Sequence, residues 1–187
     1  TTGWSGVGYF RRTLFVLRYM TSTGRLLVKP SADVSIVIST DVLSRLADLR
    51  QQYSHQPESG GLLLGRLFGD GNESAVEEVT VPSSGDKQSR FSFFRSSLHQ
   101  RAAEKYWKRT GGEGTYLGLW HTHPEPIPTP SGVDMEDWRN ALKKDVFHGN
   151  GLLFAIVGMN ALGFWYGNSP KKILFVGNFE IEKYVRN

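Results

Sequence analysis

Cysteine is absent from the 187 residues, which excludes disulfide bonds, cysteine-ligated zinc, iron–sulfur clusters and a thiol nucleophile. Any chemistry must therefore depend on His, Asp, Glu, Ser or Lys side chains, or on a metal bound through nitrogen and oxygen. Long apolar runs are also missing: none approaches the ~20 residues of a membrane-spanning helix, and no secretory signal is recognisable. We therefore expect a cytoplasmic protein that makes no membrane contact.

A strong excess of charge of one sign is missing as well. The net charge is +4 and the pI is about 9.4, but the basic residues are dispersed along the chain. The most basic segment, residues 105–109 (KYWKR), falls in a predicted helix and spreads over more than one of its faces. A nucleic-acid-binding strip needs clustered charge, so we do not expect nucleic acid to be a partner.

The hydrophobic pattern predicts a mixed α/β protein, because strands and helices are interleaved but consecutive hairpins dominate. We expect a lead-in or hairpin over residues 1–30 and one domain over residues 31–187. Helices are expected from Ser39 or Thr40 to Tyr53, from Ser96 or Ser97 to Arg109, and over 132–146 with Val146 facing inward. The expected strands are 13–19, 25–28, 34–38, 62–68, 75–81, 91–94, 115–121, 152–157, 161–166 and 173–184, with residues 82–90 left as a polar loop.

Residues 121–134 (HTHPEPIPTPSGVD) stand apart from the rest. His121 and His123 end a predicted strand, and side chains at i and i+2 of a strand point to the same side. Prolines stiffen the following loop, and Asp134 then falls in the first turn of a helix. Two imidazoles and one carboxylate form the three-ligand set of a catalytic zinc. Ser131 and Asp134 also fit a helix capping box, and the two roles are compatible.

A metal-activated water needs a proton acceptor nearby. Glu58 is the first candidate because it precedes a buried strand, and Gly60-Gly61 beside it permit close backbone approach. Its alternative role is an exposed carboxylate at the end of a strand. Glu125, within the proline-rich loop, is the second choice. His55, His99 and His148 are single histidines without a partner at ligand spacing.

At these residues the chain resembles the JAB/MPN superfamily with an intact JAMM metalloprotease motif. The family pattern is a glutamate before a Gly-Gly apolar strand, then His-x-His-Pro, and then Ser-x-x-Asp, with seven residues between the second His and the Ser. Every element is present here. The resemblance runs from about Val34 to Tyr184. It implies a single-domain JAB/MPN fold, similar to the cytidine deaminase-like fold, with a curved mixed β-sheet flanked by helices.

The resemblance also implies roles for the five motif residues. His121, His123 and Asp134 would bind one Zn²⁺ per chain, with its water hydrogen-bonded to Glu58. Glu58 would take the proton of that water and pass it to the departing amine, and Ser131 would steady the oxyanion. The chain is thus expected to be a zinc-dependent metalloprotease.

The wider sequence around the motif is similar to the stand-alone bacterial JAB proteins of antiphage CBASS operons. That similarity implies an isopeptidase that removes a cGAS-like nucleotidyltransferase, attached through its C-terminus by an E1–E2-like enzyme, from target amines. One alternative is a JAMM protease acting on the tail of another ubiquitin-like or sulfur-carrier protein. The other is a non-catalytic MPN scaffold, which the complete ligand set disfavours. Residues 145–151 are too short for the second zinc site of ubiquitin-chain-specific relatives.

Overall fold

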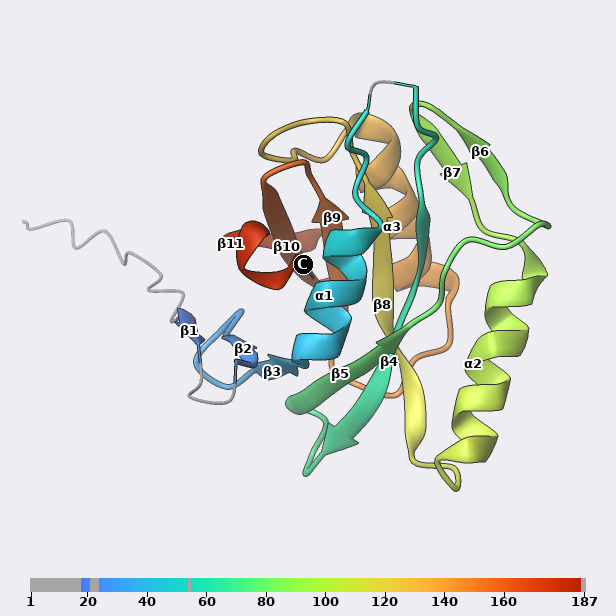
Figure 1. Cartoon of the computed structure of the whole chain (residues 1–187). Coiled ribbons are helices and arrows are strands. Elements are labelled where there is room, and N and C mark those ends of the chain that lie inside the picture. The colour runs from blue at the N-terminus through green and yellow to red at the C-terminus, as the bar shows by residue number, and fades with distance from the viewer. Residues whose placement is uncertain (1–17, 21–23, 54, 186–187) are drawn as a thin grey trace, which may run out of the picture.

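The computed structural model describes residues 18–20, 24–53 and 55–185. The fold is built around one curved β-sheet, against which the helices pack (Figure 1). The helices are α1 (Thr40–Asp48), α2 (Ser97–Arg109), α3 (Gly132–Lys144) and the short 3₁₀ helix η1 (Glu182–Tyr184). The strands are β1 (Arg18–Met20), β2 (Leu26–Val28), β3 (Ser35–Ile38), β4 (Gly60–Phe68), β5 (Glu73–Val79), β6 (Lys87–Ser89), β7 (Ser92–Phe94), β8 (Gly114–Thr122), β9 (Leu152–Val157), β10 (Ala161–Ser169) and β11 (Lys172–Glu180).

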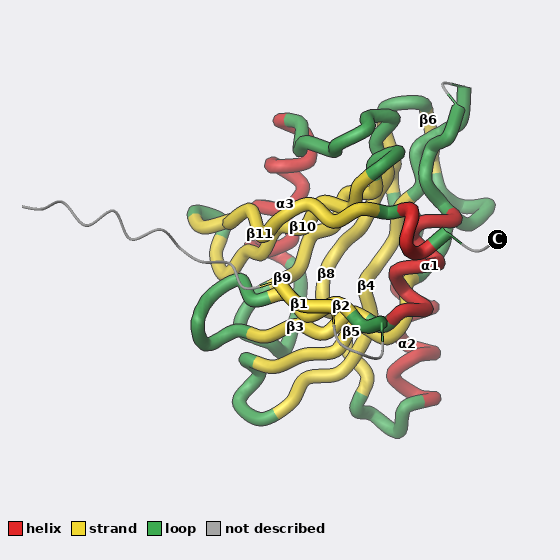
Figure 2. The backbone as a smooth tube through the Cα atoms, turned by 60° about the vertical axis from the view of Figure 1, so that its left-hand side comes forward, coloured by secondary structure: helices red, strands yellow, loops and turns green. Residues whose placement is uncertain are grey.

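The main sheet is mixed, with the strand order β1-β2-β3-β5-β4-β8-β9-β10-β11. β3 pairs with β5, and β8 with β9, in parallel, whereas the other neighbours are antiparallel. Register shifts interrupt the pairing of β4 with β5 and with β8. Such bulges increase the local twist, and Figure 2 shows the strands curving between the helices. The predicted curved, mixed α/β sheet is confirmed.

The helices cover both faces of this sheet, with α1 in front and α3 behind in Figure 1. α1 buries Val42, Leu43 and Leu46 in one hydrophobic core. α3 contributes Trp138 to a second core, where its ring stacks on Phe154 at a centroid distance of 4.8 Å. α2 packs against β4 and β8. Alternate residues of β9 enter the two cores, as expected for a strand covered on both faces.

Two helices are shorter than predicted. α1 ends at Asp48, and Tyr53 is 62% exposed. The helix stops because Gln56 Oε1 accepts the backbone N–H groups of Gln52 and Tyr53 at 2.5 and 2.9 Å, which makes a turn there. α3 ends at Lys144, and the predicted inward residue Val146 is 83% exposed.

The strand predictions were wrong at two places. Residues 87–89 form β6, which pairs with β7 in a separate two-stranded hairpin, within the segment predicted as a loop. Its residues are all exposed, so no hydrophobic alternation marked them. The last predicted strand ends at Glu180 and gives way to η1. β1 and β2 pair as the predicted hairpin, whereas residues 13–17 lie outside the described ranges.

The proposed division at residue 30 stays a prediction, although β2 pairs directly with β3 across it. Within the parts of the chain that the structure describes, no helix has the length and apolarity needed to cross a bilayer.

Candidate metal centre

The pairing of β4 with β8 brings the distant halves of the site together. The strands are antiparallel, with Gly60 opposite His121. The backbone N–H of Thr122 donates to the Ser59 carbonyl at 2.9 Å, which continues this register by one residue. The next residues in the same register are Glu58 and His123. The predicted base and a predicted ligand therefore face each other where β4 begins and β8 ends.

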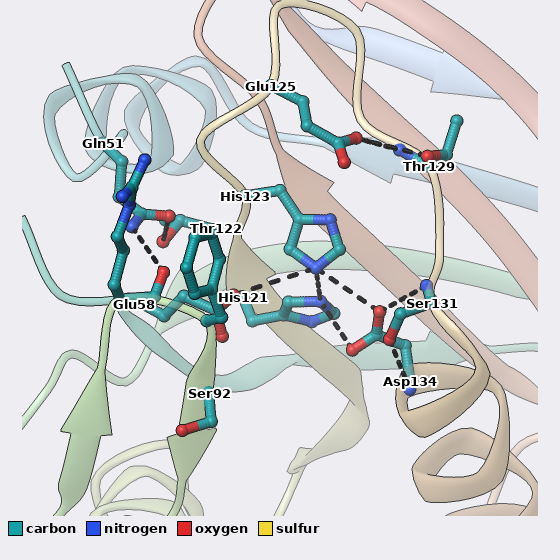
Figure 3. A network of polar contacts seen from close by, with 12 residues as sticks. Gln51, Glu58, Ser92, His121, Thr122, His123, Glu125, Thr129, Ser131 and Asp134 are labelled. Atoms are coloured by element: carbon teal, nitrogen blue, oxygen red, sulfur yellow. Dashed lines mark hydrogen bonds and ion pairs between the residues drawn. The ribbon is translucent and has the colours of Figure 1, made fainter. Parts of the chain in front are cut away.

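The two histidines and Asp134 converge on one point (Figure 3). The Nε2 atoms of His121 and His123 are 3.1 Å apart, as the i, i+2 spacing predicted. Asp134 Oδ1 lies 3.1 Å from His121 Nε2, and Oδ2 lies 3.3 Å from His123 Nε2. The backbone N–H of His123 donates to Val157 on β9 at 2.9 Å, which fixes the second histidine beyond the end of β8.

The proline-rich loop between His123 and Asp134 is tied down at several points. The Glu125 carboxylate accepts hydrogen bonds from the backbone N–H of Thr129 at 3.1 Å and from its hydroxyl at 3.2 Å. The Glu125 carbonyl accepts the N–H of Met159 at 2.7 Å. Glu125, the second choice as base, therefore helps to hold the loop that delivers Asp134.

Ser131 and Asp134 form the predicted capping box at the start of α3. The Ser131 N–H donates to Asp134 Oδ2 at 2.6 Å, and the Asp134 N–H donates to Ser131 Oγ at 3.2 Å. This arrangement orients the Asp134 carboxylate toward the histidines. Ser131 Oγ thus lies beside the Asp134 carboxylate, to which the Ser131 side chain also hydrogen-bonds.

Glu58 is buried, with 5% of its surface exposed. Its Oε1 lies 4.0 Å from His123 Nε2, and its backbone N–H donates to the Ser89 carbonyl at 2.7 Å. Gly60 and Gly61, which follow Glu58 closely in the chain, lie where there is no room for a side chain. A Cβ at Gly61 would lie 2.2 Å from the Thr80 carbonyl oxygen, and one at Gly60 would lie 2.4 Å from the Phe93 ring.

Burial and mutual charge shift the ionisation of the site. Burial raises the pKa of Glu58 to about 7, and the Asp134 charge adds to the rise while His123 opposes it. Burial lowers the pKa of His121. Burial would also lower the pKa of His123, but the hydrogen bond to Asp134 and the negative charge of Asp134 outweigh burial and raise it.

Asp134 behaves in the opposite way to Glu58. Burial alone would raise its pKa, but hydrogen bonds from His121, His123 and Ser131 hold the pKa far below its usual range. An ionised carboxylate is the protonation state that a divalent cation requires of an aspartate ligand.

These three side chains fit a zinc ion. Their ligand atoms all lie within 4.8 Å of one another. Tetrahedral zinc with bonds of about 2.0–2.1 Å separates its ligand atoms by about 3.3 Å, close to the spacings seen here. Over residues 18–20, 24–53 and 55–185, this is the sole group of three or more His, Asp or Glu side chains whose ligand atoms lie close enough together to hold a metal ion. Zinc accepts a set of two imidazoles and one carboxylate and leaves a fourth position for substrate or water.

The other single histidines do not join the site. His99 is 3% exposed, and its ring lies between Asp86 Oδ2 at 2.9 Å and Thr80 Oγ1 at 2.5 Å. His55 is exposed and stacks on Tyr53. Neither histidine belongs to the group of convergent ligand atoms.

A cleft of about 670 Å³ is lined by His121, His123 and Asp134. The β6–β7 hairpin contributes Phe91, Phe93 and Phe94 to the lining, and α3 contributes Val133. Phe91, Phe94 and Val133 are 68%, 63% and 74% exposed. The sequence interpretation missed this hairpin because β6 was taken as a loop, although the aromatic run over 91–94 was the available signal.

Comparisons with known proteins agree with this geometry. The family described as prokaryotic homologs of the JAB domain matches residues 39–168. A "CD-NTase/cGAS isopeptidase" of Vibrio cholerae serotype O1 is 34% identical over 158 residues, which cover 84% of this chain and 96% of that protein. A protein of the same name from Pseudomonas aeruginosa is 42% identical over 106 residues, or 56% of this chain and 65% of that protein.

Among solved structures, the solution structure of a protein from Desulfitobacterium hafniense has a TM-score of 0.53 at 24% identity. It covers 74% of this chain and 87% of that one, which supports the fold. Sheet, helices and the His-His-Asp cluster together define a JAB-type domain. The chain belongs to the family of prokaryotic homologues of the JAB domain, which confirms the resemblance inferred from the sequence.

Proposed function

We propose that this protein is a zinc-dependent isopeptidase of the JAMM type. It removes a cGAS-like nucleotidyltransferase, joined through its C-terminus to a target amine, in bacterial antiphage defence of the CBASS kind. The observation that carries the proposal is the convergence of the three ligand atoms beside a buried Glu58 at the floor of an open cleft. The names of the two bacterial relatives support the substrate class.

His121, His123 and Asp134 are the ligands in this proposal. When bound, zinc supplies a Lewis acid that lowers the pKa of a water molecule and polarises the scissile carbonyl. Glu58 accepts the proton of the attacking water as the new C–O bond forms. It then delivers that proton to the amine nitrogen as the C–N bond breaks, so that a free carboxylate and a free amine leave.

Ser131 is proposed to stabilise the charge that develops on the attacked carbonyl oxygen. Its hydroxyl accepts the Asp134 N–H within the capping box, and the residue lines the cleft, so that the hydroxyl proton can be donated to that oxygen as the charge develops. A fixed donor aimed at a developing oxyanion lowers the barrier because it needs no reorganisation during the reaction.

The cleft is suited to an extended polypeptide tail. Its volume of about 670 Å³ lies within the range of about 300–1,000 Å³ that is common for ligand sites. The exposed Phe91, Phe94 and Val133 in its lining offer apolar contacts. In this proposal the metal centre determines that an amide bond is cleaved, whereas the residues that line the cleft determine which protein is bound.

Cleavage of a defined conjugate tests the proposal. A cognate nucleotidyltransferase, fused through its C-terminus to a reporter, is incubated with zinc-loaded protein, with and without a chelator. Chelator-sensitive cutting at the junction is expected. A ubiquitin-like tail and a sulfur-carrier tail on the same reporter are the comparison substrates. Preferential cutting of either would replace the proposed substrate, and zinc binding without cutting of any tail would support a scaffold.

A further inference from the structure

Thr122 lies between the two histidine ligands, and its side chain is on the opposite side of the strand from theirs. It is fully buried, at 0% exposure. Its Oγ1 accepts the backbone N–H of Ser59 at 2.9 Å and donates to Gln51 Oε1 at 3.0 Å. The Thr122 backbone N–H donates to Ser59 O at 2.9 Å. Both backbone groups of the residue next to Glu58 are thus held by the residue between the ligands.

Gln51 completes this link from beyond the end of α1. It is 2% exposed, and its Nε2 donates to the Gln56 carbonyl at 2.9 Å and to the Arg90 carbonyl at 3.2 Å. Because two carbonyls fix the amide group's nitrogen, its oxygen must face Thr122. The amide orientation then requires the Thr122 hydroxyl to donate to Gln51 and leaves its lone pair for the Ser59 N–H.

The Gln51 side chain therefore joins three segments that the mechanism needs in a fixed relation; Figure 3 shows it beside Thr122. Thr122 belongs to the strand of the ligands, Gln56 precedes Glu58 in the chain, and Arg90 lies in the turn of the hairpin that lines the cleft. None of these hydrogen bonds involves the Glu58 carboxylate. They fix the position of Glu58 only indirectly, through the backbone on either side of it.

We propose that Gln51, acting through Thr122, is a positioning residue that sets Glu58 at its working distance from the metal ligands. This inference rests on the proposed role of Glu58 as the base. A general base works only within hydrogen-bond reach of the proton it abstracts, and a misplacement of about 1 Å lowers rates by about 100-fold. Loss of the link is expected to lower kcat by about 10- to 100-fold without removing a ligand.

Two variants break the link at its two ends. Gln51→Met keeps the length of the side chain but loses all three bonds. Thr122→Val keeps the β-branched shape of the side chain, which suits its place in β8, but loses the hydroxyl. Thr122→Ser restores the hydroxyl and is the rescue variant. Tyr106→Phe is the matched control, because it removes a buried hydroxyl that donates to Glu77 at 2.8 Å on another part of the sheet.

The full chain is measured in three ways: zinc per chain, kcat and KM for the reporter conjugate, and hydrogen exchange of the Ser59 amide. We expect Gln51→Met and Thr122→Val to bind one zinc, to lose kcat more than KM changes, and to exchange the Ser59 amide faster. Thr122→Ser and Tyr106→Phe should keep the wild-type kcat.

Wild-type kcat and Ser59 exchange in the zinc-loaded Thr122→Val variant would overturn the inference. A drop in kcat that Tyr106→Phe shares would also overturn it, because the effect would then be loss of stability alone. If the wild-type protein cuts no conjugate, the proposed function fails instead. Exchange at Ser59 still tests the link in that case.

Discussion

Glu58 and His123 face each other at the mouth of the β4–β8 pairing, with 4.0 Å between Glu58 Oε1 and His123 Nε2. Neither residue lies inside a strand: Glu58 precedes β4, and His123 follows β8. Their apposition results from the strand register, in which Gly60 lies opposite His121. The fold thus places a buried carboxylate beside the cluster of three candidate ligands.

Replacement of Glu58 separates catalysis from metal binding. Glu58→Gln keeps the shape of the side chain but cannot accept a proton, so kcat should fall by about 100- to 10,000-fold. Zinc should remain at one per chain, because the three ligands are intact. Steady-state kinetics and metal analysis of the same preparation measure both. Glu125→Gln is the matched control and should retain activity, because the Glu125 carboxylate bonds to Thr129 in the loop. The reverse pattern would move the base to Glu125.

Ser131 carries two functions that different substitutions separate. Ser131→Ala removes the N-cap of α3, which should lower the free energy of unfolding by about 0.5–2 kcal/mol. It also removes an oxyanion donor, which should lower kcat by about 100- to 1,000-fold. Ser131→Thr preserves both the cap and the hydroxyl. Denaturant unfolding and kinetics check the two effects, and a stability loss with unchanged kcat would leave Ser131 as a cap only.

The raised pKa of Glu58 has a consequence for the stability of the metal-free protein. The folded chain holds the Glu58 proton more tightly than the unfolded chain, since burial raises the pKa from 4.5 to about 7. The stabilising contribution of this group is therefore complete below about pH 4.5 and is lost as the pH rises to about 7.

Urea unfolding of metal-free wild type and Glu58→Gln across this range tests that consequence. The wild type should lose stability relative to the variant as the pH rises. In the zinc-loaded enzyme the cation favours the ionised carboxylate, so the acid limb of kcat/KM should lie below pH 7. A constant stability difference across the range would contradict the assigned pKa.

Asp86 should have the opposite pH dependence. Burial alone would raise its pKa, but the N–H groups of Ser83 and Ser96 and the ring of His99 hold it well below its usual range. Its contribution to stability is therefore present above its ordinary pKa and is lost as the pH falls. Asp86→Asn should lower stability at neutral pH and flatten the acid dependence. Acid unfolding followed by circular dichroism measures this, and an unchanged acid limb would exclude Asp86 as its source.

The ligand cluster could be predicted from the sequence because its signals are local. The i, i+2 histidines, the proline-rich loop and the Ser131–Asp134 capping box lie within residues 121–134, and each depends on backbone geometry of short range. The mixed sheet followed from the order of the elements. The roles of Glu58 and Ser131 stay predictions.

The parts of the structure that the sequence did not predict depend on exposed or polar residues, whose contacts leave no hydrophobic pattern. β6 is short and exposed, so its pairing with β7 left no hydrophobic pattern. The early end of α1 depends on the Gln56 side chain, which accepts hydrogen bonds from the backbone N–H groups of Gln52 and Tyr53. The buried link through Gln51 joins segments that meet only after the sheet has formed. Polar residues with such partners cannot be distinguished from exposed ones in a single sequence.

Zinc titration of the metal-free enzyme, with cleavage of the reporter conjugate as the readout, tests the central claim most directly. Wild-type activity should rise in proportion to added zinc and reach its limit at one ion per chain. Glu58→Gln should bind the same amount without activity, and His123→Ala should lose both. Full cleavage by the metal-free wild type, or by zinc-loaded Glu58→Gln, would contradict a zinc-dependent isopeptidase with Glu58 as its base.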